Sequence, residues 1–306
     1  MKSSGKLTCG CNVGYNNEIG DACAGHVGEF IQTPLLRHIR TSFASGYEPF
    51  ERCTRCLVRR TSEHFITHGI DIHIEPVNFC QLSCLYCTAT AEKTTRSQII
   101  LPSGIIRKMF TELSTSGVLV NSVIFVGYGE PLLNPELPIM VQFVRSYYPL
   151  CDISIDTNAN FNPAKAADIA NCGASLIKLS IDGVDQVSYG AYRNSGNFEK
   201  AINFARALVE SCRSSGSITR LLWKYILFNH NDSDEQIRKA MQISSDLGIE
   251  ISFDVTCTPN YSRRPLSQIR AITGSQVKFT CTLDERIMQQ LVPQMISNLD
   301  INVKYY

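Results

Sequence analysis

The stretch CQLSCLYC (residues 80–87) decides how the chain is interpreted. It directly follows IDIHIEP (70–76), an isoleucine-rich run that predicts a buried strand. Three thiolates on a loop at the carboxyl end of a strand can hold one face of a cubic iron–sulfur cluster and leave one iron open to a ligand. The ligands on this interpretation are Cys80, Cys84 and Cys87.

The alternative use of these cysteines is a zinc site, which needs a fourth ligand nearby. His64 and His73 are the candidates for that ligand, but His73 falls inside the predicted strand. The spacing therefore favours an iron–sulfur cluster.

Beyond the cysteines the chain alternates strand and helix patterns. Ser103 and Asn197 are expected N-caps, and Gly117 and Gly248 mark helix ends. Such alternation implies a parallel sheet, and the chain is too short for eight units. We expect an α/β fold, a partial (β/α)6 TIM-like barrel, whose near-continuously apolar strands are buried on both faces. The expected strands are 70–76, 121–127, 151–157, 175–181, 221–228 and 249–255.

Residues 1–62 differ in composition from the rest of the chain. They are rich in glycine and asparagine, with one helix expected around 33–44. A segment of this length needs a stabilising cross-link, such as a bound metal, to be stable on its own. We therefore expect a small N-terminal iron–sulfur module (1–62), the barrel (66–260), and a C-terminal helix and strand that complete it (261–306).

Composition excludes several classes of protein. The 306 residues include 29 Lys and Arg against 28 Asp and Glu, so no basic excess exists for general nucleic-acid binding. No apolar run approaches the ~18 residues of a membrane span, and the start MKSSGKLTCGC lacks the apolar core of a secretory signal. Thirteen cysteines, an odd number, then indicate reduced thiols and a cytoplasmic protein without a membrane.

The CxxxCxxC spacing, with Tyr86 before the last cysteine, resembles the motif of the radical S-adenosylmethionine (SAM) enzymes. The resemblance implies a [4Fe–4S] cluster and SAM as cofactors. The segment GYGEPLLNP (127–135) is similar to the family's GGEP segment, with Tyr128 in place of the first glycine. This match implies that Gly129 and Glu130 meet the amino group of the SAM methionine.

Two further segments carry the resemblance. DTNAN is similar to a turn that would place Asp156, Thr157 and Asn158 near the SAM ribose. LSIDG, followed by YGAYRNSGNF, is similar to a stretch that places Ser180, Asp182 and Arg193 near SAM. A zwitterionic methionine needs a carboxylate and a cation as partners, and the resemblance assigns these roles to Glu130 and Arg193.

The N-terminal segment resembles a SPASM or twitch module, which holds an auxiliary [4Fe–4S] cluster. The features are a glycine turn that leads to a cysteine, a helix and a closing CxxC. In the relatives such a module usually follows the barrel, so the order here is permuted. A structural zinc site and an open three-ligand cluster remain alternatives. The implied ligands are Cys9, Cys11, Cys53 and Cys56, with Cys23 as the spare candidate.

Cys257 follows the last expected barrel strand in DVTCTPN. A thiol at that rim can donate a hydrogen atom, although a buried structural cysteine is the alternative. One auxiliary cluster and one such thiol form the pattern of radical SAM epimerases. Arg263 and Arg264, close by in sequence, are either anion ligands or solvated side chains.

The resemblance is greatest to enzymes that epimerise or dehydrogenate carbohydrates and aminoglycosides. We therefore expect an epimerase with a small, carbohydrate-like substrate and an electron donor such as flavodoxin or ferredoxin. The alternatives are a dehydrogenase that passes an electron to the auxiliary cluster, an enzyme that modifies a ribosomal peptide, and an iron–sulfur scaffold or redox sensor that binds no SAM.

Overall fold

The computed structural model describes residues 1–8, 18–27, 32–47, 69–87, 90, 97–256, 258–274 and 278–279. Its centre is a seven-stranded sheet in which every neighbouring pair is parallel and the strands follow in chain order. The sheet confirms the predicted partial barrel, and β9 adds a short seventh strand to the six expected. The strands are β3 (Ile70–Ile74), β4 (Val120–Phe125), β5 (Asp152–Thr157), β6 (Leu176–Ser180), β7 (Arg220–Leu227), β8 (Glu250–Val255) and β9 (Lys278–Phe279).

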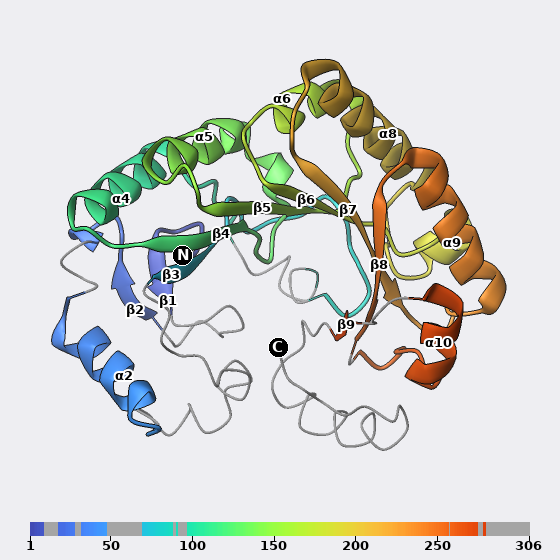
Figure 1. Cartoon of the computed structure of the whole chain (residues 1–306), viewed down its shortest axis with the longest axis horizontal. Helices are drawn as coiled ribbons and strands as arrows, with labels where there is room; N and C mark the ends of the chain where they lie inside the picture. Colours follow the sequence, from blue (N-terminus) through green and yellow to red (C-terminus); the bar gives the residue numbers. More distant parts are fainter. Residues whose placement is uncertain are drawn as a thin grey trace.

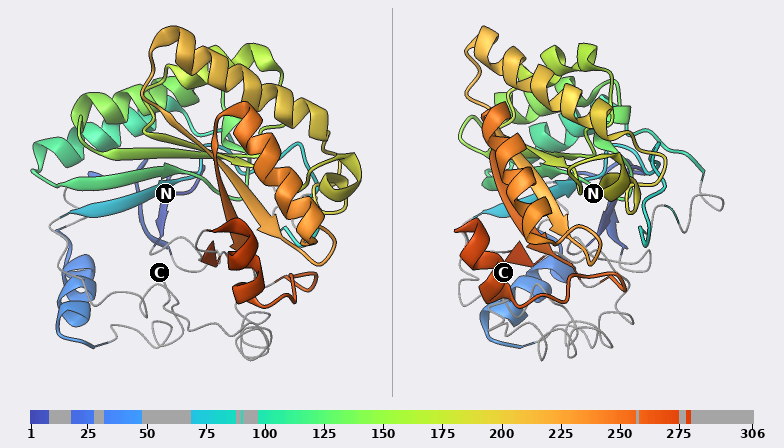
Figure 2. Two further views of the ribbon diagram at one scale, coloured as in Figure 1. Left: turned by 45° about the vertical axis from the view of Figure 1, so that its right-hand side comes forward. Right: turned by 90° about the vertical axis from the view of Figure 1, so that its right-hand side faces the viewer.

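The helices that follow the barrel strands form an arc over one face of this sheet (Figures 1 and 2). No helix among the described residues has the length and apolar character that a membrane crossing needs. The α-helices of the barrel are α4 (Ser103–Thr115), α5 (Leu137–Tyr147), α6 (Ala166–Ala170), α7 (Gln186–Gly190), α8 (Phe198–Ser215), α9 (Asp234–Leu247) and α10 (Leu266–Thr273), and short 3-10 turns are η3 (Pro131–Leu133) and η4 (Pro163–Lys165).

Local signals explain several of the helix ends. The Asn197 side chain accepts the backbone N–H of Lys200, and Gly248 closes α9 in the left-handed conformation. The expected cap at Ser103 is wrong, because Pro102 holds the N-cap position and Ser103 is already helical. The backbone N–H of Ser103 is bound instead by Glu136, a side chain from the start of the neighbouring α5.

The two faces of the sheet differ in polarity. Residues that point toward the helices, such as Ile153, Ile177 and Trp223, are buried in the main core. Their chain neighbours point to the other face because side chains alternate along a strand, and several of those are charged and half-buried. The expectation of strands that are apolar on both faces is therefore wrong, since the inner face lines the barrel interior.

The described N-terminal residues pack on the barrel. Strands β1 (Lys6–Thr8) and β2 (Glu18–Asp21) form an antiparallel hairpin, and α2 spans Pro34–Ala44, close to the expected helix. The Glu112 carboxylate on α4 accepts the backbone N–H of Val27 at 2.6 Å, and Lys108 donates to the carbonyl of Gly25 at 2.9 Å. The boundary at residue 62 and the segment 283–306, predicted as a helix and a strand, lie outside the described residues.

Candidate active site

The loop that carries Cys80, Cys84 and Cys87 lies at the carboxyl end of β3, as predicted. Backbone bonds fix it from a distant part of the chain: Ser83 N–H donates to Asn194 O at 3.0 Å, and Leu85 N–H to Tyr192 O at 2.9 Å. Tyr86 is partly exposed and adopts a φ of 62°, a conformation that a bulky residue reaches only when its surroundings enforce it. The three cysteines are therefore presented on a tightly constrained loop.

The chemistry of the loop fits an iron–sulfur cluster. Burial raises the pKa of the Cys80 thiol to about 12 and also raises that of Cys84, so the thiolates need a nearby cation to form. In the described part of the chain, no three His, Cys, Asp or Glu side chains converge on one metal-ion position. In a cubic cluster each thiolate binds its own iron, so three cluster ligands need not converge on one metal-ion position.

The segment after β4 packs directly against the chain that leads to the cysteines. A side chain at Gly129 would meet Val77 O at 2.1 Å, so only glycine allows this approach. The backbone N–H of Glu130 donates to Phe79 O at 3.0 Å. Gly129 thus holds the predicted site segment in contact with the residues that precede Cys80.

Glu130 is buried and satisfied by protein groups. Its carboxylate accepts the backbone N–H of Leu132 (3.0 Å), the hydroxyl of Thr157 (2.8 Å) and the backbone N–H of Asn158 (2.7 Å). Burial raises the pKa of this carboxyl to about 7, although the three donors oppose the shift. Glu130 therefore joins the loop after β4 to the loop after β5.

Asn158 connects that junction to the cysteines. Its side-chain amide lies 3.5 Å from Cys80 Sγ and 3.3 Å from Gln81 Oε1, and Gln81 Nε2 donates back to Asn158 Oδ1 at 3.1 Å. Sequence reasoning missed Gln81, whose position between two motif cysteines is the signal that it overlooked. The structure brings Glu130 and Asn158 together beside Cys80.

Asp182 and Arg193 form an ion pair on the other side of the loop. The guanidinium lies 2.6 Å from Asp182 Oδ2, and its Nη1 lies 3.8 Å from Cys84 Sγ. The carboxylate of Asp182 is fully buried and also accepts the backbone N–H of Ile226 at 2.8 Å. Arg193, the predicted cation, therefore has Asp182 as its counter-ion within the protein. The motif comparison did not indicate this pairing.

An apolar wall borders the same loop. The rings of Tyr192 and Phe228 are tilted against each other with centroids 4.2 Å apart, and both pack with Leu82, Ile226 and the buried Cys84. Sequence reasoning missed this wall because its members come from separate loops and strands. It excludes water from one side of the cysteines, and interactions between charges strengthen where water is excluded.

Charged pairs line the inner face of the sheet. Lys178 on β6 stands opposite Asp156 on β5, with Nζ and Oδ1 3.3 Å apart, and Lys224 on β7 lies 3.6 Å from Asp254 on β8. Ser180 pairs with Lys224 across the β6–β7 ladder. Asp156 and Ser180 therefore belong to this inner face. The lysines and Asp254 were missed, although polar residues at every second strand position were the available signal.

Other candidates lie elsewhere. Arg264 donates to the backbone carbonyl of Asp232 and pairs with Asp234 at 2.6 Å. It therefore stabilises the loop before α9, and the role of anion ligand is not supported. Cys23 is exposed, and its Sγ lies 3.9 Å from Ser4 O. The predicted residues outside the described part of the chain are Cys9, Cys11, Cys53, Cys56 and Cys257.

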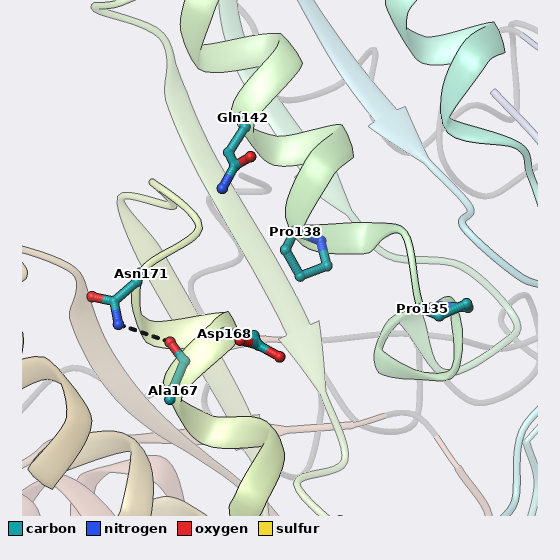
Figure 3. A pocket seen from close by; sticks show the side chains of 6 residues that line it. All are labelled: Pro135, Pro138, Gln142, Ala167, Asp168 and Asn171. Atoms are coloured by element: carbon teal, nitrogen blue, oxygen red, sulfur yellow. Dashed lines mark hydrogen bonds between the residues drawn. The ribbon is translucent and has the colours of Figure 1, made fainter.

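A pocket on the outer surface is unrelated to the cysteines. It lies between α5 and α6 on the helical side of the sheet (Figure 3). The Asn171 amide donates to the carbonyl of Ala167 at 2.9 Å, so a hydrogen bond within α6 closes one edge. Nothing reactive gathers there among the described residues. Its lining consists of Pro135, Pro138, Gln142, Ala167, Asp168 and Asn171.

Comparisons with known proteins agree with this geometry. The chain matches the Radical SAM superfamily over residues 74–243. It is 25% identical over 178 residues to a GTP 3′,8-cyclase of Petrotoga mobilis, which covers 57% of this chain and 51% of the relative. A GTP 3′,8-cyclase of Clostridium acetobutylicum is 24% identical over 189 residues, covering 61% of this chain and 57% of the relative. The chain thus spans about half the length of these relatives.

One solved structure supports the fold. Native anSMEcpe with bound AdoMet superposes with a TM-score of 0.51 at 17% identity, over 68% of this chain and 63% of that one. At this identity the likeness concerns the fold alone.

Proposed function

The chain belongs to the radical SAM superfamily, whose members use a [4Fe–4S] cluster and SAM, and from this premise we propose a site and a reaction. Cys80, Cys84 and Cys87 would hold the cluster. When bound, it supplies the electron that cleaves SAM to methionine and a 5′-deoxyadenosyl radical. The observation that carries the proposal is the convergence of Asn158 and Arg193 on the sulfurs of Cys80 and Cys84.

We propose that SAM lies across the carboxyl ends of the strands. Glu130 would meet the methionine end and Asn158 the ribose, and the hydrogen bond between them holds both loops beside Cys80. Gly129 would shape the methionine end of the site, because it packs closely against the backbone of Val77. Asp156 and Ser180 would lie under the ribose from the inner face of the sheet. The remaining proposed contacts are Tyr86, Asp182 and Arg193.

The inner face supports a small, hydroxyl-rich substrate. The pairs Asp156–Lys178 and Lys224–Asp254 offer acceptors and donors side by side, the arrangement that a diol or amino alcohol satisfies. We propose a carbohydrate-like molecule for this reason. The relatives named GTP 3′,8-cyclase act on GTP by name, but they match this chain over only half of their length.

We further propose that the reaction is an epimerisation completed by Cys257. The 5′-deoxyadenosyl radical would take a hydrogen atom from one face of a carbon, and the Cys257 S–H would return one to the other face. An electron and a proton then restore the thiol, with the electron from the auxiliary cluster or from a donor such as flavodoxin or ferredoxin. The flanking residues Thr256 and Thr258, which follow β8, are both buried.

A dehydrogenase is the second candidate, and a peptide-modifying enzyme the third. Both use the same cysteine loop and differ from the epimerase in the step after hydrogen abstraction. A dehydrogenase passes the substrate electron to the auxiliary cluster and makes Cys257 dispensable. Its product is oxidised, whereas an epimerase changes only the configuration.

The test of the radical SAM assignment is cleavage of SAM by the reconstituted protein. With dithionite as reductant, the wild-type chain should release 5′-deoxyadenosine, and the combined variant Cys80→Ala, Cys84→Ala, Cys87→Ala should release none. Cys212→Ala is the matched control, because Cys212 is a buried cysteine on the outer helix α8. A triple variant that still formed 5′-deoxyadenosine would exclude these three cysteines as cluster ligands.

A further inference from the structure

We propose that the Arg193–Asp182 pair sets the reduction potential of the cluster held at Cys84, with the guanidinium as hydrogen-bond donor to the Cys84 sulfur. This inference rests on the proposed cluster ligands. It gives Arg193 a role that the protein needs before SAM arrives, in addition to any contact with the SAM carboxylate.

The geometry fixes the guanidinium in one orientation. Its Nε donates to Asp182 Oδ2 at 2.7 Å, and Nη2 lies 2.6 Å from the same oxygen, so the flat group is clamped along one edge. Nη1, on the remaining side, then lies 3.8 Å from Cys84 Sγ. The guanidinium carbon Cζ of Arg193 also lies 5.4 Å from the centroid of the Tyr192 ring, which covers one face of the cation.

The surroundings make this arrangement electrostatically effective. The Arg193 side chain is 12% exposed and that of Asp182 is fully buried. Cys84 is buried against Tyr192 and Phe228, so little water is present to screen a charge. The pair lies close enough to the sulfur for each partner to influence it separately.

The direction of each influence depends on charge. Reduction adds one electron to the cluster and makes it more negative. An N–H donor and a positive charge beside a ligating sulfur stabilise that reduced state and raise the potential. The Asp182 carboxylate opposes this effect. Loss of Arg193 and loss of the Asp182 charge should therefore shift the potential in opposite directions.

The test is an EPR-monitored redox titration of the reconstituted protein without SAM. For Arg193→Gln we expect the reduction equilibrium constant to fall about tenfold, a midpoint about 59 mV lower. For Asp182→Asn, which keeps an oxygen for the Ile226 N–H, we expect a midpoint higher than that of the wild type. The midpoint of Arg193→Lys should lie between those of Arg193→Gln and the wild type, because lysine keeps the positive charge but lacks the planar set of N–H donors of the guanidinium.

Arg145→Gln is the control. Arg145 binds the carbonyls of Gly173 and Cys151, which lie at the opposite ends of β5 and β6 from the cysteines. The midpoint reduction potential of Arg145→Gln should equal that of the wild type.

Two results would overturn the proposal. One is an unchanged midpoint in both Arg193→Gln and Asp182→Asn with weaker SAM binding, which would make Arg193 a SAM ligand alone. The other is a shift of the same sign in both variants, which would indicate a general loss of structure. Failure of the wild type to bind a cluster would instead refute the proposed function.

Discussion

The carboxylate of Glu130 accepts the backbone N–H of Asn158 at 2.7 Å, and Asn158 in turn reaches the sulfur of Cys80. One buried side chain therefore joins the loops after β4 and β5 behind the first cysteine. Its negative charge is tolerated because three donors surround it. This contact makes the site a single connected structure rather than three independent loops.

The first prediction concerns the pH dependence of that contact. Burial raises the pKa of Glu130 in the folded chain to about 7, from the ordinary 4.5. The folded state therefore binds this proton more tightly, so the contribution of Glu130 to stability is greatest below about pH 4.5 and falls as the pH rises to about 7. At 1.36 kcal/mol per unit the loss is about 3 kcal/mol.

Urea unfolding of the apo protein at several pH values measures this loss. Glu130→Gln cannot ionise, so the difference in unfolding free energy between the wild type and this variant should change across that window and stay constant above it. A difference that does not vary between pH 4.5 and 7 would show that the carboxyl titrates normally.

The second prediction concerns Gly129. In Gly129→Ala the new methyl would lie 2.1 Å from Val77 O, and backbone atoms cannot easily move away. We expect a loss of about 3 kcal/mol in unfolding free energy, together with poor iron retention. Gly104→Ala on α4 is the control, because nothing lies within 4 Å of its added carbon, and it should gain about 0.5 kcal/mol. Equal stabilities for the two variants would contradict the close packing.

The third prediction concerns the N-terminal cysteines. We propose that Cys53 and Cys56 help to hold an auxiliary [4Fe–4S] cluster, so Cys53→Ala combined with Cys56→Ala should lower the iron content from about eight to about four atoms per chain. Residues 1–62 should then become more sensitive to protease, while the barrel keeps its cooperative unfolding. Chemical iron analysis measures the first effect. Full iron content and full turnover in this variant would make these cysteines structural.

The fourth prediction concerns Cys257. During turnover in deuterated water the thiol exchanges its proton, so an epimerised product should carry one deuterium at the inverted carbon. Cys257→Ala should still form 5′-deoxyadenosine but give no inverted product, as mass spectrometry and NMR would show. An oxidised product, or inversion without solvent deuterium, would assign the reaction to a dehydrogenase or to another donor.

Sequence reasoning predicted the order of strands and helices because the buried face of each strand is a run of β-branched and large apolar residues. It missed the charged inner face, because Lys178 and Lys224 interrupt those runs only at alternate positions. The structure brings Asn158 and Arg193 to the cysteine loop, and their contacts with SAM stay predictions.

The partners of those residues were not predictable. The hydrogen bonds of Glu130 to Thr157 and Asn158 depend on how two loops meet, and no local pattern in either loop encodes that meeting. The ion pair of Arg193 with Asp182 likewise depends on the path of the chain through α7. The need for glycine at position 129 comes from the backbone of Val77, more than fifty positions away in sequence.

The bonds from Ser83 to Asn194 and from Leu85 to Tyr192 have a consequence for biogenesis. A ribosome produces the cysteine loop more than a hundred residues before it produces the chain that clamps it. Until β6 and α7 have formed, the loop cannot hold its three cysteines in place, and the nascent thiols remain open to oxidation or to the wrong metal. Cluster delivery should therefore follow synthesis of the chain through Asn194.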